Sequence, residues 1–266
     1  MPDRGRAWAW GSRLLRVEFV LVVAFLYLPI VVVVGLSFNA SGLPTAWTGF
    51  SLDWYRAVLA NEPLLGAFRN TLIVGLAATV VATFIGTLLA LGLERTTRSA
   101  LLDSVVYVPM IVPDIVLAIA LLSFYNLVFA GLLNLQLGLW TVILSHVVFD
   151  IAFVAVVVRT RLRHFDRSIE EASLDLGANE VRTFLHITLP AIAPGVIAGG
   201  LLAFTLSFDE FIIAFFTKGT IETFPTKVYS MIRFGVTPEV NAIATFVLVI
   251  SFTLVLASQR LRGTDA

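Results

Sequence analysis

The segment Arg159–Pro190 reads RTRLRHFDRSIEEASLDLGANEVRTFLHITLP and separates two strongly apolar stretches of the chain. It holds five of the eighteen Lys and Arg residues and five of the eighteen Asp and Glu residues. Charged side chains are costly to place in hydrocarbon, so a segment of this kind stays in water. We therefore expect a polar loop that contacts another protein.

The composition predicts an all-α membrane protein. The chain has 266 residues, of which 58% are hydrophobic and 14% are charged. Soluble domains have about 45–50% apolar and about 25% charged residues. The formal net charge is zero, so any electrostatic preference must come from the distribution of the charges. The absence of cysteine excludes disulfides and thiolate metal sites.

Six apolar segments are long enough to cross a bilayer as helices, which takes about 20 residues each. They cover residues 17–38, 66–93, 101–129, 137–158, 190–216 and 240–258, and with the loop 159–189 they form one predicted permease domain over residues 1–266. The second segment is rich in Gly, Ala and Thr, which let helices approach closely in lipid. In the third, Pro113 predicts a kink.

The distribution of basic residues predicts the orientation of the six spans. With the N-terminus inside, thirteen of the eighteen Lys and Arg residues lie on the inner side and five on the outer side. Lys and Arg are retained on the cytoplasmic side, so we expect both termini and the loop 159–189 to be cytoplasmic. A cleaved signal peptide is the alternative for residues 17–38, but its apolar region would run only about 7–15 residues.

Local signals predict an elbow of two short helices in the loop. Ser168 and Glu171 have the spacing of a capping box, which would start a helix at Ile169 and end it near Leu176. Gly177 suits the left-handed position after a helix. Asn179 would cap a second short helix that ends near His186. Pro190 would then lie in the first turn of the fifth span.

The loop resembles the EAA motif of ABC-importer permeases. That motif reads Glu-Ala-Ala, three residues, Gly, nine residues and Ile-x-Leu-Pro. Glu171-Ala172-Ser173, Gly177 and Ile187-x-Leu189-Pro190 match it, with Ser173 as one mild departure. The resemblance implies a type I ABC-importer permease whose loop docks on an ATPase. The residues implied in this coupling are Glu170, Glu171, Ala172, Ser173, Asp175, Gly177 and Ala178.

The chain lacks its own means of using ATP. No G-x-x-x-x-G-K-[ST] run is present to cradle phosphates, so we expect a transport subunit, not an enzyme. ATP and Mg²⁺ would be held by a partner, and this chain is expected to carry no cofactor or metal. The resemblance implies three kinds of partner in the inner membrane and beside it: a second permease, a cytoplasmic ATPase dimer and an extracytoplasmic solute-binding protein. No nucleic acid is expected.

Four acids at membrane depth indicate a substrate pathway: Asp114, Asp150, Asp209 and Glu210. Ionisable groups in a bilayer generally face a cavity, a partner or a pathway. No Lys or Arg lies comparably deep in a predicted span, which favours a small cationic substrate.

Each acid also has a structural interpretation. His146 and Asp150 are four residues apart on one helix face and could satisfy each other. Asp114 could cap the helix that restarts after Pro113. Asp209 and Glu210 are adjacent, about 100° apart on a helix, so both cannot face one pathway unless the helix is unwound there.

Further motifs resemble the spermidine/putrescine permeases within this family. They are Phe38-Asn39-Ala40-Ser41, Asp53-Trp54-Tyr55, Ser207-Phe208-Asp209-Glu210, Lys227-Val228-Tyr229-Ser230-Met231 and Pro238-Glu239-Val240-Asn241-Ala242. The resemblance implies polyamine import, with the segments 39–65 and 217–239 receiving the binding protein. The alternatives are an ABC permease for iron, thiamine or an aminophosphonate, and a proton-coupled secondary transporter. The last would show inverted repeats and broken helix pairs, which are not convincing here, and would leave the EAA loop unexplained.

Overall fold

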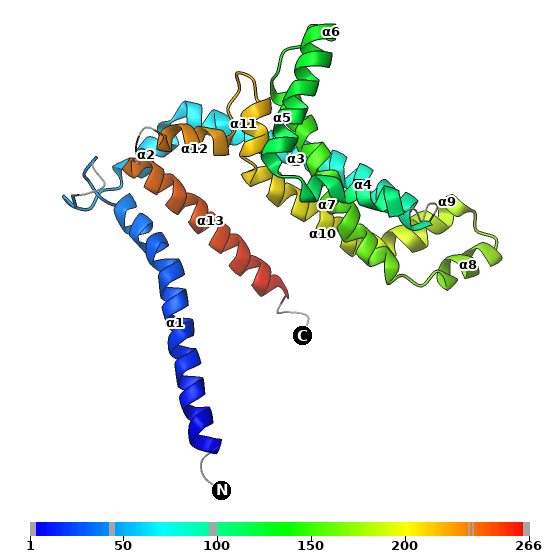
Figure 1. The fold of residues 1–266 in the computed structure, drawn as a ribbon, viewed down its shortest axis with the longest axis horizontal. Helices are drawn as coiled ribbons and strands as arrows, with labels where there is room; N and C mark the ends of the chain where they lie inside the picture. Colours follow the sequence, from blue (N-terminus) through cyan, green and yellow to red (C-terminus); the bar gives the residue numbers. More distant parts are fainter. Residues whose placement is uncertain (1–3, 43–45, 96–99, 234, 236, 263–266) are drawn as a thin grey trace. The chain divides into compact units, whose positions relative to one another are not determined.

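The computed structural model describes residues 4–42, 46–95, 100–233, 235 and 237–262 (Figure 1). It divides into two compact units. The terminal unit comprises Met1–Glu62 and Val228–Ala266, and the central unit comprises Pro63–Lys227. In the described ranges almost all regular structure is helical, as the composition predicts.

The terminal unit is built on α1 (Arg4–Ser37), α2 (Asp53–Ala60) and α13 (Pro238–Arg262). Its central polar residue is Asn39, which is fully buried. The Asn39 side-chain amide donates to the Ala46 carbonyl at 2.8 Å and accepts from the Thr48 amide at 3.1 Å. The Asn39 main-chain carbonyl accepts from Trp54 Nε1 at 2.8 Å. One side chain thus closes the loop between α1 and α2.

The central unit contains α3 (Glu62–Arg95, from Pro63 on), α4 (Ala100–Ile111), α5 (Asp114–Phe124), the π-helix η1 (Tyr125–Ala130), α6 (Gly131–Leu133) and α7 (Leu139–Arg163). It continues with α8 (Ser168–Asp175), α9 (Glu180–Thr183), the π-helix η2 (Phe184–Thr188), α10 (Leu189–Asp209) and α11 (Ile212–Thr217), and α12 (Phe224–Ile232) begins in it. Its largest core joins α3, α7 and α10 through Ala82, Ala90, Val154, Ala155, Val158, Leu162, Ile192 and Ala203. Small side chains dominate it, as expected for helices that approach closely.

Gly86 of α3 packs closely against α7. A Cβ atom on Gly86 would lie 2.8 Å from Val154 Cβ and 3.0 Å from the Ile151 carbonyl oxygen. Nothing lies within 4 Å of the corresponding position on Gly92, one and a half turns further along α3. The Gly-rich character of this span therefore has a packing reason at Gly86.

The Gly86→Ala variant is expected to lose about 1–3 kcal/mol of stability through overpacking. Gly92→Ala should instead gain up to about 1 kcal/mol, because alanine is the better helix former. Thermal unfolding of both variants in detergent measures the difference. Equal melting temperatures for the two would contradict the close packing of α3 on α7.

The spans differ from the prediction in two places. Among the described residues, five helices are long and apolar enough to cross a membrane: Leu14–Ser37, Glu62–Arg95, Asp114–Leu133, Leu139–Arg163 and Glu180–Asp209. Leu101–Ile111 and Pro238–Thr253 are shorter apolar helices. The predicted third span over 101–129 is divided at the predicted position, because α4 ends at Ile111 and a separate helix begins after Pro113. Pro113 has ψ of 135°, which no α-helix contains.

The fifth span is the second difference. The apolar helix begins at Glu180 instead of residue 190, because α9, η2 and α10 form one continuous helical stretch. It ends at Asp209, and α11 is a separate helix, so the predicted segment 190–216 is divided between two helices.

Candidate coupling loop and translocation site

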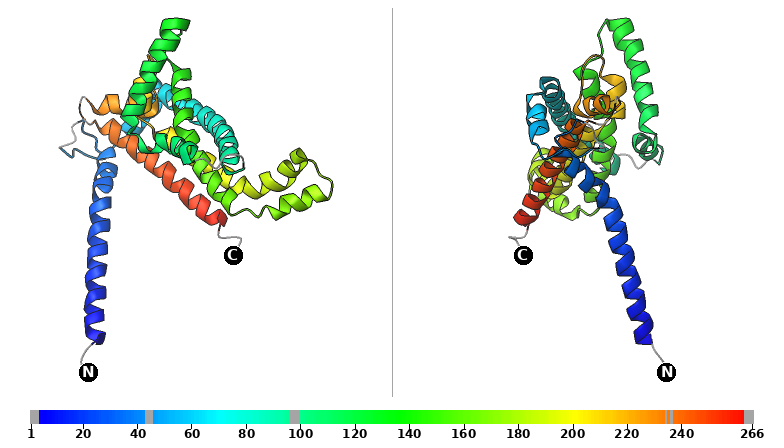
Figure 2. Two further views of the ribbon diagram at one scale, coloured as in Figure 1. Left: turned by 45° about the vertical axis from the view of Figure 1, so that its right-hand side comes forward. Right: turned by 90° about the vertical axis from the view of Figure 1, so that its left-hand side faces the viewer.

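The hairpin of α8 and α9 lies at one end of the central unit (Figures 1 and 2). Gly177 has a φ of +89° and makes the turn after α8, as the sequence predicts. Asn179 caps α9, since its side-chain oxygen accepts from the Arg182 amide at 2.8 Å. The hydroxyls of Ser173 and Thr183 lie 2.9 Å apart and join the two arms.

The predicted capping box at the start of α8 is wrong. Ser168 is already the first residue of the helix, and its amide donates to Asp166 Oδ1 at 3.0 Å. This backbone bond lowers the pKa of the Asp166 carboxyl below its usual value. Asp166 therefore takes the capping role two residues before the expected serine, which the Asp-x-Ser spacing could have indicated.

The second short helix does not end near His186 as predicted. Backbone dihedrals remain helical from Thr183 through Leu189, with a π-helical stretch at Phe184–Thr188. Pro190 is accommodated at the start of α10, where a missing amide donor costs least. One helix of 30 residues thus runs from Glu180, in the hairpin, to Asp209.

The predicted coupling residues take different positions in the hairpin. Glu171, Ala172, Asp175 and Gly177 are exposed, and Ala178 is half-buried. Glu170 is turned inward, where its carboxylate contacts the Arg95 guanidinium and the Thr188 hydroxyl. Sequence reasoning missed the exposed apolar set on the same hairpin: Ile169, Leu174, Leu176, Val181 and Leu185. Apolar residues at helical spacing in a polar loop are the signal that could have found it.

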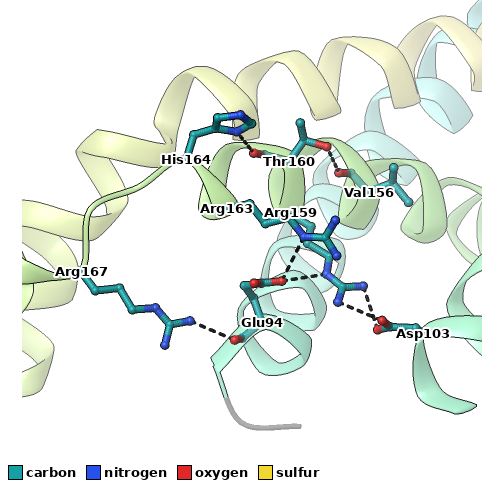
Figure 3. A network of polar contacts seen from close by, with 8 residues as sticks. All are labelled: Glu94, Asp103, Val156, Arg159, Thr160, Arg163, His164 and Arg167. Carbon is teal, nitrogen blue, oxygen red and sulfur yellow. Dashed lines mark hydrogen bonds and ion pairs between the residues drawn. The ribbon is translucent and has the colours of Figure 1, made fainter. Parts of the chain in front are cut away.

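A network of ion pairs lies beneath the hairpin (Figure 3). The Arg159 side chain, only 9% exposed, donates to Glu94 Oε2 at 2.9 Å and to both carboxylate oxygens of Asp103 at 2.8 and 3.0 Å. Arg163 also reaches Glu94, at 3.5 Å, and Arg167 donates to the Glu94 main-chain carbonyl at 2.9 Å. The network joins α3, α4, α7 and the segment that leads into α8.

The helix that carries Asp209 and Glu210 is unwound between these two residues. Asp209 is the last residue of α10, and Glu210 has φ of −64° and ψ of 113°, which is extended backbone. The Glu210 carboxylate accepts from the Ile213 amide at 3.0 Å at the start of α11. Asp209 and Glu210 are therefore not held about 100° apart by a continuous helix, and both side chains can face one pathway.

Three of the predicted pathway acids lie near one another around this break. Asp209 and Glu210 are adjacent, and Ile213 of α11 packs on Ala118 of α5, one turn beyond Asp114. Asp114 stands in the first turn of α5, directly after the other helix break, and Pro113 occupies the cap position instead. Asp209 is exposed, while Glu210 and Asp114 are half-buried. Two helix breaks, each with a carboxylate, thus meet in the central unit.

Asp150 lies deeper, on α7, and is fully buried. Among the described residues its carboxylate lies close to the Ser207 hydroxyl on α10 without a hydrogen bond of regular geometry. The expected pairing with His146 is wrong, because His146 Nδ1 lies 2.7 Å from the Ser207 hydroxyl on α10. Asp150 interacts electrostatically with Glu210, so the fourth acid belongs to the same region without facing open space.

Comparisons with known proteins place this geometry in a family. Residues 82–262 match the model of the binding-protein-dependent transport system inner membrane component. The spermidine/putrescine transport system permease protein PotC of Escherichia coli (strain K12) is 41% identical over 252 residues, covering 93% of this chain and 94% of that protein. The putrescine transport system permease protein PotI of the same strain is 41% identical over 237 residues, covering 87% and 84%.

Solved structures share the fold at low sequence identity. A chain from a bacterial ABC transporter involved in the import of the acidic polysaccharide alginate superposes with a TM-score of 0.72 at 15% identity, covering 98% of this chain and 99% of that chain. A chain of the MetNI methionine ABC transporter gives 0.59 at 18% identity, covering 80% and 97%. The predicted ABC-importer permease fold is confirmed, while the six-span count and the orientation stay predictions. The chain is a multi-span permease subunit and not an enzyme, and it belongs to the family of binding-protein-dependent transport system inner membrane components.

Proposed function

We propose that the chain translocates polyamines, spermidine or putrescine, across the cytoplasmic membrane as one permease of an ABC importer. The observation that carries the proposal is the acidic region at the two helix breaks, where α11, directly after Asp209 and Glu210, packs against α5, which begins at Asp114. No ion pair joins these acids to a Lys or Arg within the described residues. The names of the 41%-identical relatives, PotC and PotI, support the same class of substrate.

The broken helices suit a cationic solute for a physical reason. At Asp209 the α-helix ends, so the last main-chain carbonyls lose their intrahelical donors and can accept from an ammonium group. Carboxylates beside them add charge-assisted bonds, which are about twice as strong as neutral ones. An alkylammonium with several nitrogens would meet Asp209, Glu210 and Asp114 in turn.

We infer that the partners are a PotB-like second permease, a PotA-like ATPase dimer that binds ATP and Mg²⁺, and a PotD-like extracytoplasmic binding protein. The exposed apolar side chains of the α8–α9 hairpin would dock on the ATPase, with Glu171 and Asp175 at their edge. In this arrangement the hairpin is cytoplasmic and both termini lie inside. The outer segments 39–65 and 217–239 would receive the binding protein.

The mechanism follows from the continuous helix Glu180–Asp209. At about 1.5 Å per residue its 30 residues extend roughly 45 Å, from the docking hairpin to the acidic region. A packed helix transmits displacement along its axis, so closure of the ATPase would move Asp209 relative to the acid on α5. Alternating exposure of the acids would carry the cation inward.

The most informative experiment is ATP hydrolysis by the reconstituted complex, screened over spermidine, putrescine, thiamine, iron and an aminophosphonate. We expect polyamines to stimulate hydrolysis and to be taken up. Stimulation by only one of the other solutes would assign that solute, and not polyamines, as the substrate. No stimulation by any solute in an assembled complex would contradict the proposal.

The Glu210→Gln variant is expected to raise the KM for polyamine uptake about tenfold, because a charge-assisted bond to the ammonium is lost. The ATPase should still assemble with this variant. Glu18→Gln, which changes an exposed acid on α1, is the matched control and should leave KM unchanged. An unchanged KM in Glu210→Gln would assign Glu210 to capping α11 through Ile213.

A further inference from the structure

Two adjacent residues at the C-terminal end of α3, Glu94 and Arg95, contact α7, the segment before α8, α8 itself and the end of η2. The Glu94 carboxylate accepts from Arg159 and Arg163 of α7. Its main-chain carbonyl accepts from Arg167, directly before α8. The Arg95 guanidinium contacts Glu170 within α8 and lies 3.5 Å from the Thr188 hydroxyl at the end of η2.

These contacts are partly or largely withdrawn from solvent. The Glu170 and Glu94 side chains are 15% and 16% exposed, and Thr188 is buried. Pairs at this depth are screened less by water and salt than pairs on an open surface. Glu94 and Arg95 each contact a segment far away in the sequence, so these contacts depend on tertiary packing and not on helix propensity.

The position of α8 depends on such contacts because the two segments that connect α8 to the rest of the chain are not helical. The chain leaves α7 at Arg163 and enters α8 through the non-helical residues 164–167. It leaves α8 through the turn at Gly177. A helix of 8 residues held only by these two links would swing when a partner pushed it, and the displacement would be absorbed in the links.

We propose that Glu94 and Arg95 are positioning residues that make α8, the end of α3 and the start of α10 move as one body. Movement of α8 then reaches α3 directly through Arg95–Glu170 and reaches the long helix through Thr188. This second route runs beside the covalent path through Gly177. The inference rests on the proposed function, since it concerns how ATP hydrolysis elsewhere in the complex drives transport here.

Charge reversal tests the proposal in the complete reconstituted transporter. Arg95→Glu changes a residue outside the hairpin and should leave ATPase assembly and basal hydrolysis within about twofold of the parent. Glu170→Arg is the complementary reversal on α8. Each should lower the solute taken up per ATP hydrolysed about tenfold, the size expected when one coupling contact worth about 1.4 kcal/mol is lost. The double variant restores the pair in reverse and should recover the ratio to within about twofold.

Arg182→Glu is the matched control, because Arg182 is an exposed arginine on α9. It should leave the ratio unchanged. Equal ratios in the parent and both single variants would overturn the proposal, and so would a double variant no better than the singles. Neither result depends on which solute is carried, so failure of polyamine import in the parent complex remains a separate outcome.

A second variant covers the case in which charge reversal disturbs folding. The chain has no cysteine, so Arg95→Cys with Glu170→Cys gives one unique thiol pair. With free thiols the ratio of uptake to hydrolysis should be low. Joining the thiols with a short bifunctional reagent should restore it, because one rigid body loses nothing by being cross-linked. A joined pair that abolishes uptake would show that this contact opens in each cycle and would overturn the proposal.

Discussion

Replacing Arg159 with alanine is expected to lower the free energy of unfolding by about 2–3 kcal/mol. The Arg159 side chain is 9% exposed and serves Glu94 and Asp103 together. Removing one partner of a buried pair costs about 3–5 kcal/mol, because the remaining charge stays desolvated. The Asp103 side chain is 32% exposed and recovers some hydration, so the expected loss lies at or just below the lower limit of that range. Thermal unfolding in detergent measures the loss.

Arg163→Ala is the matched control for this prediction. Its side chain is 55% exposed and approaches Glu94 only at 3.5 Å. Exposed pairs contribute about 0–1 kcal/mol, so the melting temperature should hardly change. Arg159→Lys should fall between the two, since one ammonium cannot offer the planar fork that meets two carboxylates. A stability loss at Arg163 equal to that at Arg159 would contradict the central role of Arg159.

Replacing Leu176 with aspartate is expected to release the ATPase from the permease. Leu176 is 89% exposed at the tip of the hairpin, the largest exposed fraction among the large hydrophobic residues of the described chain. A well-placed apolar anchor contributes about 2 kcal/mol or more to an interface, so affinity should fall at least about thirtyfold. Introducing a charge adds a desolvation cost on top of the lost contact. Co-purification of the ATPase with the permease measures the result.

Leu132→Asp separates this effect from a general defect. Leu132 is 77% exposed on α6, outside the hairpin, and receives the same substitution. We expect it to keep the ATPase bound. Retention of the ATPase by Leu176→Asp would refute docking through the hairpin tip, and loss of the ATPase in both variants would point to misfolding.

The sequence correctly predicted features that depend on a few neighbouring residues. Gly177 takes the left-handed conformation because only glycine adopts it without cost, and Asn179 caps the next helix with its own side chain. Composition and the lengths of the apolar segments predicted a helical membrane protein, since transfer into hydrocarbon depends on the side chains alone. Even here the start of α8 was misplaced, because Asp166 competed with Ser168 for the cap.

Only the tertiary structure decided what the charged residues do. Arg159 meets Glu94 and Asp103 across 65 and 56 positions of sequence, and Glu170 meets Arg95 across 75. His146 pairs with Ser207 on α10 and not with Asp150, which lies on the same helix as His146. The break at Glu210 also escaped prediction, because an apolar run with no proline there has helical propensity throughout. Sequence by itself predicted the apolar helical segments and determined where the hairpin turns, since hydropathy and backbone preference are local. Which charges meet depended on helix packing, because ion pairs join whatever side chains the folded chain brings within a few ångströms.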